Sequence, residues 1–510
     1  MPLRKESFLH AILSSVTWKS GERGASFFKH IVIASAIGLS TQLDIYYMVI
    51  ALLGLFVFSW GSLVEIVAVP ALVACQQEGD VKKFRTIASG LFQLTLLGSA
   101  VLAGIILLAS DYVAEVAIGF DEARKARLAD AFFWVLPMML FWVPKSFLLS
   151  LLRAKRHFST SYQGDFILGA AGLLCIIIWW DVPHVLLWSA SFAVVACFLF
   201  VLAFTWRDVL LVENPFQPTV LTVFTLAPGL LLLQSATLIF SLTDRIYLSF
   251  LEAGKISAFA YALAIVLIMP GAVNTGLSFL TVLAEEKSRA KRSEKFNDLV
   301  SLCVFASVVV GCFLLVGGED AVRFLFERGL FDDEATANVS LALVALSPLV
   351  FTTIVQPLFD NIALVEKRIG VMVIRVAIGI VANIILSGVA LFVLGWGLFG
   401  IALATTLSNW IMLLASAQAA RKLGYNISFW RHLAWGVWLG LWAVVAMVVL
   451  FFVPASTAWG GLVQIMVVGM SLSLAVGLGA MVYLGRERQL IMSTLGRMLR
   501  RVVAVVRRRG

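Results

Sequence analysis

Charged residues are scarce in this chain, and their scarcity excludes a water-soluble protein. Asp, Glu, Lys and Arg make up 14% of the 510 residues, whereas 61% are hydrophobic, and the mean hydropathy is +0.97. A soluble globule of this length needs far more polar surface than these residues provide. The composition therefore indicates an integral membrane protein.

Cysteine is also scarce. The five cysteines lie in or beside apolar segments without paired spacing, at Cys75, Cys175, Cys197, Cys303 and Cys312. This spacing predicts neither a disulfide framework nor a metal site. We interpret these cysteines as small packing residues.

Motifs for catalysis are missing as well. The chain has no G-x-x-x-x-G-K-[ST] loop for nucleotide phosphates and no H-E-x-x-H pair for zinc, and its five histidines are scattered. We therefore expect a protein that is not an enzyme and that needs no metal or cofactor. A cleaved signal peptide is not expected either, because the N-terminus lacks a compact apolar region followed by a small-residue cleavage site.

Long apolar segments dominate the sequence. A helix needs about 20 mainly apolar residues to cross the hydrocarbon layer of a bilayer. By this criterion the sequence predicts about 14 membrane-spanning helices. They cover residues 8–38, 44–74, 87–110, 130–152, 159–180, 185–206, 220–251, 256–284, 296–318, 336–364, 369–395, 397–419, 432–453 and 461–485. The predicted fold class is an all-α integral membrane protein.

Lys and Arg are unequally distributed among the loops between these segments. If both termini lie in the cytoplasm, the loops and the tail on that side hold 27 of the 39 basic residues, and the outer loops hold six. The positive-inside rule describes this bias, so we predict cytoplasmic termini. The basic residues are then next to anionic lipid headgroups, and the net charge of +9 does not indicate nucleic-acid binding.

A weak internal repeat indicates two similar lobes. Residues 38–84 resemble residues 251–296 at an offset of about 213. Six predicted helices separate the two copies, which therefore run in the same direction through the membrane. We predict an N-terminal lobe (1–207), a C-terminal lobe (208–425), two further helices (426–485) and a basic amphipathic cytoplasmic tail (486–510). The tail is predicted to lie on the inner membrane surface, and the alternative is a solvated basic segment.

Charges inside the apolar spans identify the candidate site, because each costs roughly 2.5–3.5 kcal/mol even on the most lenient scale. The first span holds Lys19, Arg23 and Lys29, and the seventh holds Asp244 and Arg245. In the register of the repeat, Arg245 falls within one turn of the position equivalent to Lys29. These four cations predict a binding site for a polyanion such as a pyrophosphate, which they contact without covalent chemistry.

Two acidic residues accompany the candidate site. Asp44, at the start of the second span, and Asp244 are candidates for charge balance or for coupling to H⁺ or Na⁺. A structural interpretation is the alternative: the lysine and arginine side chains extend to the membrane interfaces, and Asp244 pairs with a neighbour. The sequence leaves both interpretations open.

Other polar residues within the spans are expected to bridge helices, which is the commoner role of buried polar groups in membranes. They are Glu65, Lys145, Asp165, Asp360, Arg375, Asn274, Asn383 and Asn409. Glu65 and Lys145 form one candidate pair. Prolines inside spans, among them Pro144, Pro348 and Pro357, predict bent helices around a cavity, and such helices suit a transporter.

Several short motifs resemble one known family. The chain has LFERGLFD at 325–332, EAT at 334–336 and GLFGIALATT at 397–406, and its N-terminal part has Arg23, Lys29, Gly38, DIYY at 44–47 and Val69-Pro70. Together these residues resemble the MurJ/MviN family of lipid II flippases in the MOP exporter superfamily, over residues from about 20 to 425. The sequence departs from the family pattern at FVFSWGS (56–62) and at ALA (262–264).

The resemblance implies two six-helix lobes around a central cationic cavity, two C-terminal helices that shape a groove for the lipid tail, and alternating access. It also implies that Arg23 and Lys29 hold the pyrophosphate. We therefore predict a flippase in the bacterial inner membrane. Its predicted cargo is lipid II or a related undecaprenyl-pyrophosphate-linked sugar, moved from the inner to the outer leaflet.

Two alternatives stay open at this point. One is a MATE-like cation-coupled multidrug antiporter, which favours acidic cavity residues. The other is a non-transporting scaffold of an envelope glycan synthesis complex. In each case anionic lipids are expected partners, and glycan-synthesis proteins are further candidates.

Overall fold

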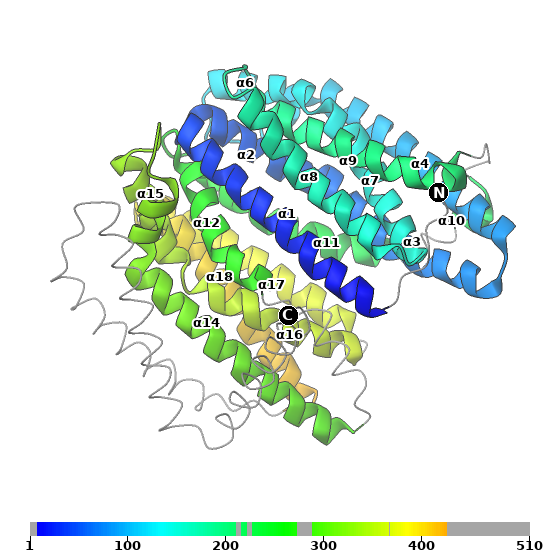
Figure 1. Ribbon diagram of the computed structural model, residues 1–510. Helices are drawn as coiled ribbons and strands as arrows, with labels where there is room; N and C mark the ends of the chain where they lie inside the picture. Colours follow the sequence, from blue (N-terminus) through cyan, green and yellow to red (C-terminus); the bar gives the residue numbers. More distant parts are fainter. Residues whose placement is uncertain (1–7, 211–215, 222–226, 273–287, 367, 426–510) are drawn as a thin grey trace, which may run out of the picture. The chain divides into compact units, whose positions relative to one another are not determined.

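The computed structural model describes residues 8–210, 216–221, 227–272, 288–366 and 368–425 (Figure 1). Every regular element within these ranges is a helix, so the predicted all-α fold class is confirmed there. The predicted spans 432–453 and 461–485 and the basic tail lie outside the described residues.

The chain forms two compact units. The first contains the described residues up to Ala260 together with Arg328–Ala335, and the second contains Tyr261–Glu327 and the described residues from Thr336 onward. The unit boundary thus falls inside α12, whereas the lobe boundary after residue 207 follows the sequence repeat and stays a prediction.

The helices of the first unit begin with α1, a single helix through Lys19, Arg23 and Lys29. They are α1 (Phe8–Ile37), α2 (Thr41–Leu53), η1 (Gly54–Phe58), α3 (Ser59–Glu78), α4 (Val81–Leu108), α5 (Ser110–Ala114), α6 (Glu122–Trp134), α7 (Leu136–Ala154), α8 (Phe158–Ile178), α9 (Val185–Val209), α10 (Pro218–Leu221), α11 (Ala227–Leu248) and the start of α12 (Lys255–Ala272). Helices α1 and α8 pack side by side, α7 packs on α3, α4 and α9, and α11 packs on α2 and α3 (Figure 1).

The second unit is built mainly from five long helices. They are α14 (Arg289–Phe326), α15 (Asp333–Leu346), α16 (Leu349–Val365), α17 (Ile369–Gly388), which continues as η3 (Val389–Val393), and α18 (Gly397–Lys422). Helices α15 and α16 meet at a 42° bend, and Pro348 precedes the first residue of α16. The bend predicted from this proline is confirmed.

Length and composition make several helices competent to cross a membrane. Among the described residues seven helices pass this test, or eight if α15 and α16 form one broken span. The predicted span 44–74 corresponds to Thr41–Glu78, in which a π-helical turn joins α2 to α3. Some of the 14 predicted membrane-spanning helices lie outside the described residues, so the structure does not test that number.

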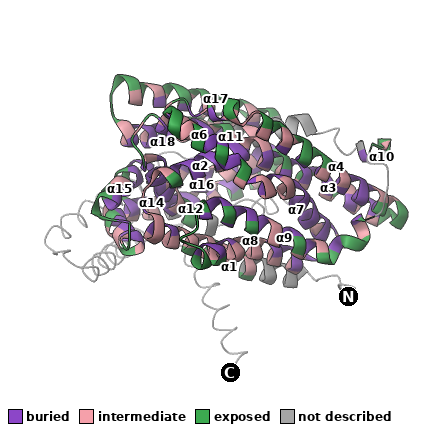
Figure 2. Ribbon diagram, turned by 90° about the horizontal axis from the view of Figure 1, so that it is seen from above, coloured by how far each residue is buried: buried purple, intermediate pink, exposed green. Residues whose placement is uncertain are grey.

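Exposed apolar residues on α4 and α17 indicate which faces of these two helices contact lipid. On α17, Ile374, Val381 and Ile385 are more than half exposed, and they recur at the spacing of one helical face. The membrane-competent windows of α4 and α17 are 33% and 28% buried, and Figure 2 shows exposed residues along both helices. A soluble protein does not expose such stripes, so both helices contact the hydrocarbon layer.

The loop after α14 belongs to the first unit and docks on the end of α1. The Leu330 amide donates to the Ser35 carbonyl at 2.9 Å. Gly38 follows α1 with a φ of +63°, and a Cβ there would lie 2.5 Å from the Leu330 carbonyl oxygen. Glycine at position 38 therefore permits both the left-handed turn and the close approach of the loop.

Candidate functional site

The three cations of α1 have different surroundings. Lys19 and Arg23 are exposed, whereas Lys29 is half-buried. The Lys19 ammonium lies 5.6 Å from the ring centroid of Tyr162 on α8, and Arg23 makes no hydrogen bond or ion pair with another described residue. A rise of about 1.5 Å per residue places Lys19 roughly 15 Å along the helix axis from Lys29.

Lys29 and its neighbour His30 contact two adjacent tyrosines of α2. The Lys29 ammonium donates to the Tyr46 hydroxyl at 3.4 Å and lies 5.9 Å from the ring centroid. The Tyr47 hydroxyl lies 3.2 Å from Nδ1 of His30, and the two tyrosine rings are 5.4 Å apart. We call Tyr46 and Tyr47 the tyrosine pair. Through this pair, Lys29 and His30 join α1 to α2.

Arg245 reaches the same pair from α11. Its guanidinium interacts electrostatically with the adjacent Asp244 and, more weakly, with Tyr47, and its Nη1 donates to the Ser241 carbonyl at 2.8 Å and to the Ser241 hydroxyl. The Nε atom of Arg245 is buried and has no hydrogen-bond partner. A buried donor without a partner is costly, so the surrounding residues leave one donor of Arg245 unsatisfied. The adjacent Asp244 is 3% exposed.

Of the four predicted cations, Lys29 thus contacts the tyrosine pair, and Arg245 lies on α11, which packs on the helix that carries the pair. Lys19 and Arg23 lie further along α1. The tyrosine pair and His30 were not among the predicted site residues. Only one feature of the sequence pointed to the tyrosines: Tyr46 and Tyr47 occupy positions at which the family motif has aromatic residues. The contact between α1 and α2 could not be predicted from the sequence.

Asp44, in the first turn of α2, contacts the start of α12. This carboxylate is 2% exposed and accepts hydrogen bonds from the amides of Gly254 at 2.6 Å and Ser257 at 2.8 Å. It also accepts a hydrogen bond from the Ser257 hydroxyl. The negative charge therefore faces the first amides of a helix, where the helix dipole stabilises it. Both oxygens of Asp44 are engaged in joining α2 to α12.

A second charged cluster lies on α3, α7 and α8, and it corrects one predicted pair. Glu65 pairs with Arg153 rather than with Lys145, and Arg153 also pairs with Asp165 at 3.2 Å. Lys145 is 3% exposed, and its ammonium lies 3.6 Å from the ring centroid of Trp142. The sequence placed Glu65 and Lys145 in the second and fourth spans of one lobe, but Arg153 meets both carboxylates.

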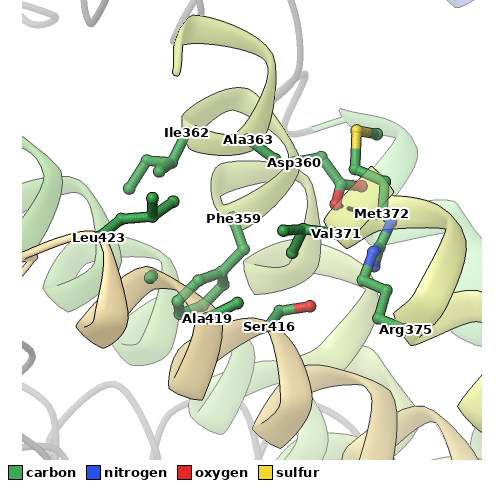
Figure 3. A pocket seen from close by; sticks show the side chains of 11 residues that line it. Phe359, Asp360, Ile362, Ala363, Val371, Met372, Arg375, Ser416, Ala419 and Leu423 are labelled. Carbon is green, nitrogen blue, oxygen red and sulfur yellow. Dashed lines mark ion pairs between the residues drawn. The ribbon is translucent and has the colours of Figure 1, made fainter. Parts of the chain in front are cut away.

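In the second unit an ion pair joins α16 to α17, as predicted for two of its polar residues. Arg375 Nη2 lies 2.7 Å from Asp360, and Gln356 donates to Asp360 and to Ser416 of α18. Figure 3 shows Arg375 and Asp360 directed toward one another beside a cavity of about 10 Å³. A cavity of this size holds at most one water molecule. The cluster therefore links helices and leaves no room for a substrate.

No metal centre is evident in the described ranges. Within them, no three His, Cys, Asp or Glu side chains gather as ligands for a metal ion. The chemistry available at the candidate site is binding by cations and hydroxyl groups. These features define a class, namely a multi-pass helical membrane protein with cations inside its apolar helices.

The family follows from comparison with known proteins. Residues 33–475 match the model of the lipid II flippase MurJ family, and the chain belongs to this family. The family consists of multi-pass flippases for a lipid-linked glycan in the bacterial inner membrane, so the chain is by family a transporter and not an enzyme. The family resemblance inferred from the motifs is confirmed. No curated protein sequence matches the chain.

Solved structures agree with this family at the level of the fold. The chain is 17% identical to the lipid II flippase MurJ in an inward closed conformation, with a TM-score of 0.76 over 95% of this chain and 99% of that chain. An inward-facing MATE transporter of the MOP superfamily gives 13% identity and a TM-score of 0.60 over 78% and 98%. A MOP superfamily transporter from Pyrococcus furiosus gives 13% and 0.50 over 83% and 99%.

Proposed function

We propose that this chain moves a lipid-linked glycan with a pyrophosphate headgroup from the inner to the outer leaflet by alternating access. The proposed cargo is lipid II or a related undecaprenyl-pyrophosphate-linked sugar, and both termini lie in the cytoplasm. The single observation that carries the proposal is Arg245, whose buried Nε has no hydrogen-bond partner and whose guanidinium interacts electrostatically with Tyr47, beside the Tyr46 hydroxyl that Lys29 contacts.

The other charged residues have supporting roles in this proposal. Arg23 and Lys19 are exposed and attract the anionic headgroup along α1, while Lys29 and Arg245 bind it. A pyrophosphate carries two or more negative charges and several oxygens, so cations from different helices bind it together. Asp44 and Asp244 balance part of the positive charge, Asp244 through its electrostatic interaction with the adjacent Arg245.

Translocation is tested in liposomes that contain the purified protein and a fluorescent undecaprenyl-pyrophosphate-linked sugar. A membrane-impermeant quencher reports which leaflet holds the label. Arg245→Ala is expected to lower the rate about tenfold or more, because one charge-assisted hydrogen bond is worth about 1.5–3 kcal/mol and 1.4 kcal/mol is a factor of ten. Arg23→Ala is expected to lower the rate less, because Arg23 attracts the headgroup without binding it.

The matched control is Arg85→Ala. Arg85 is an exposed arginine on α4 that makes no hydrogen bond or ion pair with another described residue, so its loss should leave the rate unchanged. Wild-type rates in both site variants would refute the cation site. A wild-type protein that moves no labelled lipid at all would favour the scaffold alternative.

The proposed orientation has its own test. Asp121→Cys and Lys82→Cys place a thiol in predicted outer and cytoplasmic loops, and the five native cysteines are buried. In cells with an opened outer membrane, an impermeant maleimide should label position 121 and spare position 82. The reverse pattern would overturn cytoplasmic termini without affecting the cation site.

A further inference from the structure

A second cavity in the first unit lies between α2, α6 and the start of α9. Its volume is about 300 Å³, and all of its lining residues belong to the first unit. They are Gln42, Ile45, Arg127, Asp130, Ala131, Pro183, His184, Leu186 and Leu187. Neither Lys29 nor Arg245 lines this cavity. The cavity is therefore separate from the candidate cation site.

Four polar side chains form the rim of the cavity and have no partner there. Gln42, Arg127, Asp130 and His184 are all exposed, and none of them hydrogen-bonds or pairs through its side chain with another described residue. Arg127 and Asp130 stand three residues apart on one face of α6, yet they form no ion pair. Their donors and acceptors are therefore free to serve a ligand.

The rim is held in place by the surrounding fold. Asp121 caps α6 through the Arg124 amide at 2.7 Å, and this hydrogen bond lowers the pKa of the Asp121 carboxyl. His184 has a φ of +60°, a left-handed conformation that is strained for a side chain with a Cβ and that clusters at functional sites. Its ring stacks on Trp134 with centroids 5.1 Å apart.

The chemistry of the lining selects a class of ligand. The rim offers the Asp130 carboxylate, the Arg127 guanidinium, the Gln42 amide and the His184 imidazole. Together they suit the hydroxyl groups of a neutral polyol, because each hydroxyl group both donates and accepts hydrogen bonds. Asp130 repels a polyanion. The floor of Ile45, Leu186 and Leu187 is apolar and accepts the C–H face of a ring.

Size and position narrow the ligand further. About 300 Å³ is at the small end of ligand pockets, which suits one sugar ring and excludes a lipid tail. Gln42 precedes Tyr46 by four residues on α2, which is about 6 Å along the helix axis. A pyrophosphate at the tyrosine pair would therefore place an attached sugar within reach of this cavity.

We propose that the cavity between α2, α6 and α9 is a subsite for one sugar ring of the transported glycan. The inference rests on the proposed function, because cytoplasmic termini place α6 and the start of α9 at the outer side of the membrane. Carbohydrate recognition is then separate from pyrophosphate recognition. The cations bind the charged linkage, and this subsite binds the ring that is attached to it.

The test uses free sugars and requires no transport. Saturation-transfer NMR on the full-length protein in nanodiscs is carried out with glucose, galactose and N-acetylglucosamine, each at millimolar concentration. At least one of them should receive saturation from the wild-type protein. Asp130→Asn, which preserves the size of the side chain, and Arg127→Gln, which removes its charge, alter exposed residues and should each weaken that binding about tenfold.

The matched control is Asp111→Asn, an exposed aspartate of the first unit outside the cavity, and it should bind sugar as the wild type does. Absence of sugar binding to the wild type, or unchanged binding in both rim variants, would overturn the subsite. Binding of inorganic pyrophosphate that Arg127→Gln abolishes would overturn it as well. Failure of the proposed function appears elsewhere, as unchanged lipid translocation in Arg245→Ala.

Discussion

Replacing Asp44 by asparagine separates a structural role of this carboxylate from a role in ion coupling. The carboxylate is 2% exposed and accepts three hydrogen bonds, from the Gly254 amide and from the amide and hydroxyl of Ser257. Asparagine retains one acceptor oxygen and turns an NH₂ group toward a donor. We therefore expect Asp44→Asn to destabilise the protein even though its shape is almost unchanged.

The magnitude follows from the contacts that are lost. A hydrogen bond to a charged group contributes about 1.5–3 kcal/mol, and a buried donor left without a partner costs about 1–3 kcal/mol. Partial relaxation of the site reduces the sum, so we expect a loss of about 2–4 kcal/mol. Removal of the Ser257 hydroxyl in Ser257→Ala should cost about 1 kcal/mol, since it deletes one of the three hydrogen bonds.

Thermal unfolding in detergent measures these changes. At about 2 °C per kcal/mol for a large chain, the midpoint should fall roughly 4–8 °C in Asp44→Asn and about 2 °C in Ser257→Ala. The double variant should lose less than the sum, because the two residues share a contact. Asp111→Asn, which changes an exposed aspartate, is the control. An unchanged midpoint in Asp44→Asn together with lost translocation would refute the structural reasoning and favour ion coupling.

Two further substitutions test the packing of the first unit by the same measurement. Gly38→Ala should lower the midpoint by several degrees, because the φ of +63° costs about 1–2 kcal/mol for a residue with a Cβ and the new atom would lie 2.5 Å from the Leu330 carbonyl oxygen. Gly24→Ala, with nothing within 4 Å, should leave the midpoint unchanged or raise it, and an equal loss at both glycines would contradict the argument. Arg153→Ala leaves two part-exposed carboxylates without their cation and should cost about 1–3 kcal/mol. Asp165→Asn should cost less, and the opposite ranking would show that Arg153 does not hold the cluster.

The sequence predicted the helices well because the membrane imposes a single requirement on each of them. A span must be apolar over about 20 residues, and 44–74 and 369–395 were recognisable on that basis as Thr41–Glu78 and Ile369–Val393. Predicted ends were less accurate. Helix α14 runs from Arg289 to Phe326, well beyond the predicted 296–318, because a helix continues through charged residues after it leaves the hydrocarbon layer.

The contacts of the candidate site were harder to predict than its cations. Intramembrane charge marked Lys29 and Arg245, since such residues are costly and rare. The partners of Asp44 could not be predicted in the same way, because Gly254 and Ser257 lie more than 200 residues further along the chain and bind largely through backbone amides. Every residue has an amide, so a sequence does not distinguish these two.

In the described part of the first unit several acidic side chains are bound by other groups, whereas two of the predicted cations keep donors without a hydrogen-bond partner. Asp44 is engaged by the start of α12, and Glu65 and Asp165 are engaged by Arg153. Arg23 has no such partner among the described residues, and Arg245 keeps a free Nε. These acids are thus held by other groups, whereas Arg23 and Arg245 keep donors without a hydrogen-bond partner in the described ranges, and a low-dielectric surrounding strengthens the attraction of such cations for an anion. A site of this kind attracts a mobile polyanion and does not fix a permanent ion pair, which is the property that a flippase needs in order to release its cargo.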